Sequence, residues 1–293
     1  NTIIGGANND GNSAPIPGHG AAYVYRFNGS TWVQEQKLLA SDRAQGDMFG
    51  FSVGVFGDVV LVGAYLDQDS GPESGSAYVF RRTGSTWVQE RKLLPSDGAP
   101  YVSFGYSVDV AGNLALIGAF GDDSFGTNFG SAYVFRFNGS TWNQETELHG
   151  LDSVSNGKFG WAVAVGDDVA AVGATNGGAN GPGGVYVFRK SGASWLEEQK
   201  LVAPDGAGND NLGFSLDLSG DVIVVAAPGH SHYVFGAGAA YLFTATCTAP
   251  PTTYTLTTTT AGTGSGTVTK SPDQVSYAPN TVVTLTATPA ASS

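Results

Sequence analysis

Two carboxylates that follow the apolar run at residues 59–64 have the spacing of a loop that binds a hard cation. Asp67 and Asp69 lie in the sequence Asp-Gln-Asp-Ser-Gly, and carboxylate oxygens at such spacing suit Ca²⁺. A later copy of the same stretch offers Asn176 and Asn180 instead, and the last copy has no carboxylate there. Turn-forming aspartates explain the pair better than metal ligands do. We therefore expect no metal site, with Asp67 and Asp69 as the candidates if one exists.

A second set of aspartates recurs along the chain at intervals of 55, 55 and 53 residues. Its members are Asp42, Asp97, Asp152 and Asp205. Recurrence in every copy favours a structural task, such as an Asx-turn that caps backbone N–H groups. A shared ring of ligands is the alternative.

Other side chains near these aspartates suit binding rather than catalysis. The candidate binding residues are Asp10, Tyr65, Asp67, Asp69, Phe120, Asp122, Asp123, Phe125, His230, His232 and Tyr233. His230 and His232 lack a third metal ligand nearby, so surface histidines are the simpler interpretation. Motifs for a nucleophilic serine, a zinc protease or a phosphate loop are absent from the sequence. We therefore expect no catalytic residues and no cofactor.

The elements that must position these residues are repeated. Aromatic residues and glycines return at intervals of 55, 55 and 53 residues, with one further interval of 55 for tyrosine. The series are Trp32, Trp87, Trp142 and Trp195; Tyr23, Tyr78, Tyr133, Tyr186 and Tyr241; and Gly50, Gly105, Gly160 and Gly213. A register kept over five copies indicates a repeat architecture.

Each copy is predicted to form four short strands. In the second copy these are residues 51–55, 59–64, 76–81 and 86–93, of which the last two alternate between apolar and polar residues. Tight turns at Gly57-Asp58 and Thr83-Gly84 join the first strand to the second and the third to the fourth, and the first copy has Asn28-Gly29 there. Four-stranded antiparallel units in tandem predict an all-β fold, a β-propeller. A row of separate sandwiches is less favourable because a single unit is too small to bury its own core.

The pattern Phe-Gly-x-Ser-Val, followed by Val-Gly-Ala, resembles the FG-GAP repeats of integrin α-chain propellers and of secreted bacterial relatives. The resemblance covers about residues 1–245 and implies a propeller that binds proteins or glycans. Repeats of the integrin type often carry an Asp-rich calcium loop between strands one and two. Here the connection between strands one and two is only a two-residue turn, Gly57-Asp58, so the resemblance does not imply a calcium site in this chain.

The predicted domain boundaries follow from where the repeat pattern stops. Residues 1–246 hold about five partial or complete blades, either a five-sheet structure with imperfect closure or part of a seven-bladed propeller. Residues 247–253, with two consecutive prolines, read as a linker. The Thr-rich residues 254–293 resemble an incomplete InlB B-repeat module with two or three strands. An unpaired strand edge there would be able to accept a strand from a partner.

Composition limits the function classes further. The formal charge of −12 argues against nucleic acid as a partner, because phosphates attract Lys and Arg. No apolar stretch approaches the roughly 20 residues of a membrane span, so we expect no membrane insertion. A single cysteine excludes an intrachain disulfide framework, and the Thr, Ser, Gly and Asn content suggests a secreted or cell-surface protein.

The direction of the strands separates two faces of the expected propeller. The short turns between strands one and two and between strands three and four lie on one face, and the long connections lie on the other. Long variable loops on a rigid scaffold usually carry binding. We therefore expect an extracellular, non-catalytic adhesion or structural protein that binds protein or glycan through the long-loop face. The alternatives are a self-assembling filament or matrix subunit and a carbohydrate-active enzyme on a propeller scaffold.

Overall fold

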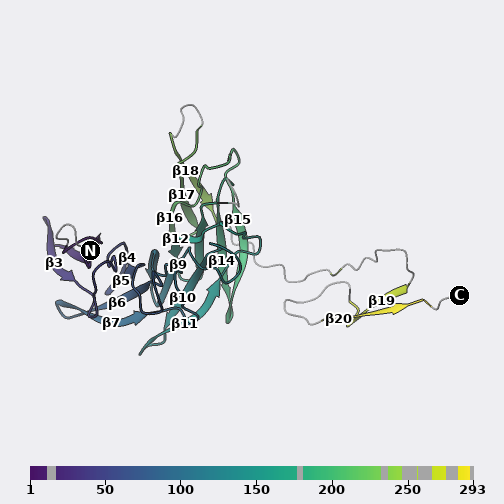
Figure 1. Cartoon of the computed structure of the whole chain (residues 1–293), viewed down its shortest axis with the longest axis horizontal. Helices are drawn as coiled ribbons and strands as arrows, with labels where there is room; N and C mark the ends of the chain where they lie inside the picture. The colour runs from purple at the N-terminus through teal and green to yellow at the C-terminus, as the bar shows by residue number, and fades with distance from the viewer. Residues whose placement is uncertain are drawn as a thin grey trace. The chain divides into compact units, whose positions relative to one another are not determined.

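The structure is a computed structural model that describes residues 1–11, 18–176, 181–231, 237–245, 256, 266–274 and 283–290. The chain divides into two compact units, Asn1–Ala245 and Thr246–Ser293 (Figure 1). All regular elements of the described residues are β-strands, as predicted. The described part of the chain has no helix long and apolar enough to cross a membrane.

The first unit contains eighteen strands in five antiparallel sheets. Blade 1 has β1 (Thr2–Ala7), β2 (Ala21–Phe27) and β3 (Trp32–Leu38). Blade 2 has β4 (Ser52–Phe56), β5 (Val59–Ala64), β6 (Ser76–Thr83) and β7 (Thr86–Leu93). Blade 3 has β8 (Ser107–Ala111), β9 (Leu114–Ala119), β10 (Ser131–Phe137) and β11 (Trp142–Leu148). Blade 4 has β12 (Phe159–Val165), β13 (Val169–Ala174), β14 (Gly184–Ser191) and β15 (Ser194–Leu201). Blade 5 has β16 (Ser215–Ser219), β17 (Val222–Ala227) and β18 (Ala239–Thr244).

Within every blade the strands pair in the order of the chain, which confirms the prediction of a β-propeller with three- and four-stranded antiparallel blades. The turns form where the sequence places them. Gly57 and Gly84 take positive φ in the two tight turns of blade 2, where most side chains would be strained. At the Asn28-Gly29 turn the Asn28 side chain accepts hydrogen bonds from the backbone N–H groups of Ser30 and Thr31.

A bulge in the outer hairpin of blades 1 to 4 positions a recurrent ion pair. In blade 2 the register between β6 and β7 shifts between Val79 and Phe80, and the extra residue on β7 is Glu90. The Arg81 side chain donates to this carboxylate at 2.6 Å. The same pairs in the other blades are Arg26–Glu35, Arg136–Glu145 and Arg189–Glu198. The bulge thus turns one acidic side chain per blade toward its arginine.

Neighbouring blades pack face to face through clusters of buried apolar side chains. The face of blade 2 that packs on blade 3 is here called its forward face and consists of Val59, Leu61, Ala77 and Val79. Its backward face packs on blade 1 and consists of Val60, Val62, Tyr78 and Phe80. Because side chains alternate along a strand, every central strand serves both interfaces. This explains the continuous apolar runs of β5, β9 and β13, which are buried at every position.

The close approach of adjacent blades requires glycine. A Cβ atom on Gly63 would lie 2.0 Å from the backbone oxygen of Gly105 in the next blade. Gly105 itself takes positive φ, +87°. The Gly-Ala and Phe-Gly pairs of the repeat are therefore the two sides of one backbone contact, and any larger residue at Gly63 would separate the blades.

The two end blades differ from the inner ones in burial. The forward-face residues of blade 5 are exposed, with Leu242 at 75 %, while Ile223 and Val225 on its backward face are buried against blade 4. On the backward face of blade 1, Ile3 and Trp32 are each 45 % exposed. Each end blade is thus covered by a neighbour on one face only within the described residues.

The second unit contains a two-stranded antiparallel sheet, β19 (Gly266–Ser271) and β20 (Thr284–Pro289). The predicted linker, residues 247–253, lies outside the described residues. The resemblance of residues 254–293 to an InlB B-repeat stays a prediction.

Candidate functional site

Most of the predicted binding residues lie in the long connections, and the structure shows what each of them contacts. His232 and Tyr233 lie outside the described residues. The loops of neighbouring blades are joined by backbone hydrogen bonds, for example from Leu66 to Asp47 and from Tyr101 to Pro72. The long loops therefore form one connected surface along the described part of the propeller.

In blade 2 the two predicted metal candidates surround a lysine. The Lys92 ammonium lies 2.9 Å from Asp67, 2.6 Å from Asp69 and 2.8 Å from Asp42. Asp67 is buried and also accepts hydrogen bonds from Ser76 Oγ and Tyr78 OH at 2.8 and 2.7 Å. The position where a cation would bind these carboxylates is thus taken by an ammonium group of the chain itself.

The pKa values agree with a fully charged cluster in blade 2. Burial alone would raise the pKa of Asp67, but hydrogen bonds from Lys92, Tyr78 and Ser76 outweigh it and bring the pKa below the usual 3.8. Burial alone would lower the pKa of Lys92, but hydrogen bonds to Asp42, Asp69 and Asp67 outweigh it and raise this pKa. Charge and counter-charge therefore stabilise each other.

Blade 3 has the same arrangement with one reversal of charge. Asp97, Asp122 and Glu147 bring carboxylate oxygens within 4.8 Å of one another, and Glu147 pairs with Tyr133 as Lys92 pairs with Tyr78. Tyr133 OH donates to Asp122 at 2.8 Å, and Ser131 Oγ donates to Glu147 at 2.6 Å. Burial, followed by the charges of Asp97 and Asp122, raises the pKa of Glu147. These three carboxylates are the residues of blade 3 that could hold a cation.

The other three blades resemble blade 2 at this place. A basic side chain lies beside an aspartate in each, in the pairs Lys37–Asp10, Lys200–Asp152 and His230–Asp210. A tyrosine of the repeat donates to the recurrent aspartate in blades 2, 4 and 5, in the pairs Tyr78–Asp42, Tyr186–Asp152 and Tyr241–Asp205. Asp42, Asp152 and Asp205 thus accept a hydrogen bond from the tyrosine hydroxyl of the following blade, a structural contact that differs from the Asx-turn expected from the sequence.

Asp123 and Phe125 lie in the loop between β9 and β10. Asp123 accepts a hydrogen bond from the backbone of Asn128, and Asp122 accepts one from the backbone of Ser124. The Phe125 ring is 55 % exposed, and its centroid lies 4.5 Å from that of His149. The carboxylates hold this loop in shape, while Phe125 presents an aromatic surface to solvent.

A strip of aromatic rings crosses the four blades from 2 to 5 on the long-loop side, where each first strand begins. We call it the aromatic strip; its members are Phe51, Tyr65, Tyr106, Phe120, Trp161 and Phe214. Successive ring centroids lie 4.9 Å apart for Phe51 and Tyr106, 4.8 Å for Tyr106 and Trp161, and 5.8 Å for Trp161 and Phe214. Such distances are those of favourable ring contacts.

The ends of the aromatic strip are open to solvent, with Phe51 38 % and Phe214 47 % exposed. The Lys158 ammonium lies 4.9 Å from the centroid of the Trp161 ring, a cation–π contact. The strip therefore combines a rigid aromatic surface with the positive charge of Lys158, which suits binding more than it suits proton transfer.

Four members of the aromatic strip were not among the predicted site residues. Phe51, Tyr106, Trp161 and Phe214 each follow the repeated glycine of the Phe-Gly or Leu-Gly pair, at intervals of 55, 55 and 53 residues. This register was available in the sequence. Only Tyr65 and Phe120 of the strip were predicted, because they lie in the irregular long loops, whereas the other four occupy a regular position of the repeat.

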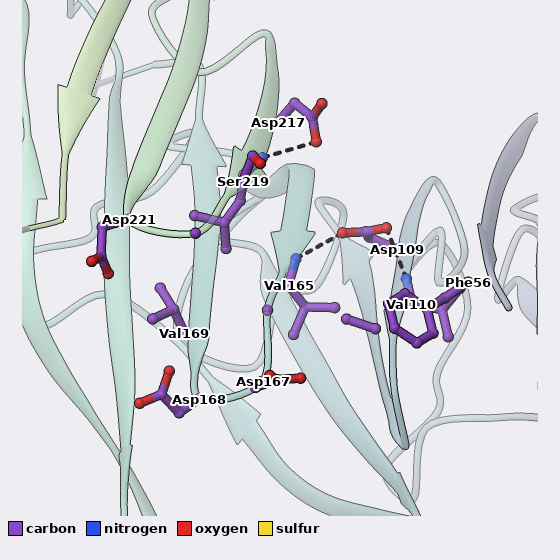
Figure 2. A pocket seen from close by; sticks show the side chains of 14 residues that line it. Phe56, Asp109, Val110, Val165, Asp167, Asp168, Val169, Asp217, Ser219 and Asp221 are labelled. Atoms are coloured by element: carbon purple, nitrogen blue, oxygen red, sulfur yellow. Dashed lines mark hydrogen bonds between the residues drawn. The ribbon is translucent and has the colours of Figure 1, made fainter.

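The short-turn face carries a hollow of about 440 Å³ that no prediction placed there (Figure 2). Its acidic lining residues are Asp109, Asp167, Asp168, Asp217 and Asp221. Burial raises the pKa of Asp109 to about 6, although the backbone N–H groups of Val165 and Val110 donate to it at 2.7 and 2.8 Å. Since Val165 belongs to the next blade, Asp109 joins two blades, and this contact explains its burial.

Comparison with known families identifies the repeat. The model of the FG-GAP repeat matches residues 32–80, 87–135, 142–188 and 195–243, which together make up more than half of the chain. The protein is thus a repeat β-propeller, and the chain belongs to the FG-GAP repeat family. A comparison with curated proteins finds no match. An FG-GAP propeller fits a binding or adhesion-type role in general.

Proposed function

We propose that this chain is an extracellular, non-catalytic binding protein of the adhesion type, whose ligand contacts the aromatic strip and the adjoining long loops. The observation that carries the proposal is the strip itself. Six rings from four blades contact one another and keep part of their surface in solvent at Phe51 and Phe214. Exposed aromatic clusters on rigid elements are typical of binding surfaces.

The chemistry of the strip favours a polypeptide or glycan of a cell surface or matrix. Ring faces offer apolar contact to aliphatic and aromatic side chains and to the C–H faces of sugars. The net charge of −12 disfavours a nucleic acid, and Lys158 is the cation found beside the strip. Neither a cofactor nor a metal is needed for this role.

The test compares two single variants in binding to immobilised glycans and matrix polypeptides. Trp161→Ala removes the ring at the centre of the strip and is expected to weaken binding about 30-fold, the effect of losing an aromatic hot spot worth ~2 kcal/mol. Phe56→Ala removes an exposed ring that lines the hollow on the short-turn face, and it should leave binding unchanged. Thermal unfolding of both variants checks that the fold is intact.

Two results would overturn the proposal. Equal loss of binding in Trp161→Ala and Phe56→Ala would remove the strip from the ligand site. Turnover of a bound glycan, abolished by Asp67→Ala or Asp122→Ala, would replace a binding protein by a carbohydrate-active enzyme.

A further inference from the structure

The junction between blades 2 and 3 contains a hollow of about 410 Å³ at its outer rim. The hollow lies between β7 and β11, the outermost strands of these two blades. The buried Leu93 and Phe135 and the exposed Arg91 are among its lining residues. Both blades have four strands and a described blade on either side, so this hollow is a feature of a junction inside the repeat array.

The corresponding place at the junction between blades 1 and 2 is occupied by the side chain of Gln36. Its amide accepts a hydrogen bond from the backbone N–H of Trp87 and donates one to the backbone oxygen of Trp87, each at 2.8 Å. These two backbone groups point away from their own sheet, because Arg82, which pairs with Trp87, uses its N–H on the opposite side, toward Asp58. The Gln36 amide therefore occupies the position at which a further β-strand would pair with β7.

Blade 3 has the same strand edge without this contact. The backbone N–H of Phe137 donates to Asn113, so Trp142, which pairs with Phe137, also directs its backbone groups outward from β11. Arg91 takes the repeat position of Gln36, 55 residues further along the chain. Among the described residues the Arg91 guanidinium makes no ion pair and no hydrogen bond, and no side chain bonds the backbone of Trp142. In this part of the structure the edge of β11 is thus open beside an unpaired cation.

The indole of Trp142 lacks a partner as well. Its N–H is buried and has no hydrogen-bond acceptor within the described part of the chain. In blades 2 and 4 the equivalent indole donates to a glutamate of the preceding blade, in the pairs Trp87–Glu35 and Trp195–Glu145. The equivalent glutamate of blade 2, Glu90, is instead held by two guanidinium nitrogens of Arg81, at 2.6 and 3.4 Å. Since buried polar groups are almost always paired, the junction between blades 2 and 3 differs from these two junctions in its unused hydrogen-bonding capacity.

We propose that this hollow binds an extended, acidic polypeptide segment of a partner protein, which pairs with the outer edge of β11 at Trp142 and places a carboxylate on Arg91. The Gln36 amide shows that an amide group fits such an edge, and the backbone of an extended peptide repeats this group at every residue. The guanidinium of Arg91 matches a carboxylate in charge and in geometry. The hollow shares no lining residue with the aromatic strip, so this proposal does not rest on the proposed function.

Titration of the isotope-labelled full chain with blocked peptides, followed by NMR, tests the proposal. The probe is the peptide Val-Thr-Glu-Thr-Val, in which the valines and the glutamate point to the same side of an extended strand. At peptide concentrations up to ~5 mM, which bracket weak binding, the backbone amide signal of Trp142 should shift. The signal of Trp87, whose amide is already bonded to Gln36, should stay in place. The peptide Val-Thr-Gln-Thr-Val should bind about tenfold more weakly, because it lacks the charged acceptor.

Three variants connect the NMR signal to the hollow. Arg91→Ala should bind the Glu and Gln peptides equally weakly, because the guanidinium is removed. Arg91→Gln places the side chain of the blade 1 position beside Trp142 and should prevent the binding of both peptides. Arg43→Gln, which removes an exposed arginine of the loop before β4, should bind like the unmodified chain. The proposal is overturned if Trp142 does not respond to the Glu peptide, if the Gln peptide binds as well as the Glu peptide, or if either Arg91 variant binds like the unmodified chain.

Discussion

The loop clusters of blades 2 and 3 have an aspartate–tyrosine hydrogen bond in common and differ in the charge of the side chain beside it. In blade 2 the Lys92 ammonium joins Asp42, Asp67 and Asp69, and in blade 3 Glu147 adds a third negative charge to Asp97 and Asp122. The buried aspartate and its tyrosine are the same in both, Asp67 with Tyr78 and Asp122 with Tyr133. The ammonium offsets part of the negative charge of the first cluster, whereas the second cluster consists of carboxylates alone.

The difference shows which part of the arrangement the scaffold needs. The aspartate–tyrosine hydrogen bond forms beside the positive Lys92 in blade 2 and beside the negative Glu147 in blade 3. It can therefore stabilise the loops without the lysine. The lysine then stabilises its own blade, and the glutamate at the equivalent position gives blade 3 a third negative charge. Blade 3 also carries the exposed Phe125, so the acidic cluster and this aromatic ring lie in the same loop region.

The largest effect is expected from Lys92→Met. The variant leaves the buried carboxylate of Asp67 without its counter-charge, and removal of one partner from such a pair costs about 3 kcal/mol. Urea denaturation at pH 7 measures the change in the free energy of unfolding. If the free energy of unfolding falls by less than the loss of an exposed ion pair would cause, the hydrogen bonds from Tyr78 and Ser76 alone satisfy Asp67.

The reverse change in blade 3, Glu147→Lys, should stabilise the protein. It places an ammonium group beside Asp97 and Asp122, as in blade 2, and is expected to add about 1 kcal/mol to the free energy of unfolding, the typical net gain from one intramolecular hydrogen bond. The measurement is the same denaturation, made with a chelator present so that divalent cations do not neutralise the unmodified cluster. A loss of stability would contradict the equivalence of the two blades.

Lys200→Met in blade 4 is the matched control for Lys92→Met. The partner of Lys200 is Asp152, whose side chain is 62 % exposed, and exposed pairs contribute only about 0.5 kcal/mol. Its urea midpoint should lie close to that of the unmodified chain. A loss as large as that of Lys92→Met would mean that burial does not distinguish these clusters.

The smallest effect is a change of pH dependence in Glu147→Gln. Burial and the charges of Asp97 and Asp122 raise the folded-state pKa of Glu147 above its ordinary 4.5, so the folded chain binds this proton more tightly than the unfolded chain. The unmodified protein therefore gains stability relative to Glu147→Gln as the pH falls through the raised pKa toward 4.5.

The two proteins are compared by plotting the free energy of unfolding against pH. The difference between the two plots reports the titration of Glu147, because Asp109, with its pKa of about 6, titrates in both proteins. The opposite sign applies to Asp67, whose lowered pKa gives stability that is lost only as the pH falls below 3.8. A pH-independent difference between the unmodified protein and Glu147→Gln would contradict the charge repulsion in blade 3.

The blades were predictable because their signals are local in the sequence. Runs such as residues 59–64, closed by turns at Gly57-Asp58 and Thr83-Gly84, specify strand, turn and strand without knowledge of the neighbours. The lysine clusters were not predicted. Asp42 and Lys92 are separated by 50 residues and meet only because the loop that enters blade 2 returns beside its last strand.

The sequence by itself determined a β-propeller of FG-GAP type, since the repeat register sets strands, turns and the glycines between blades. Only the tertiary structure decided how the repeated positions combine. It joined Phe51, Tyr106, Trp161 and Phe214 into one strip and filled the candidate metal position of Asp67 and Asp69 with Lys92. The physical reason is that these contacts join side chains from different strands, loops and blades, which the pattern within a single strand or turn does not specify.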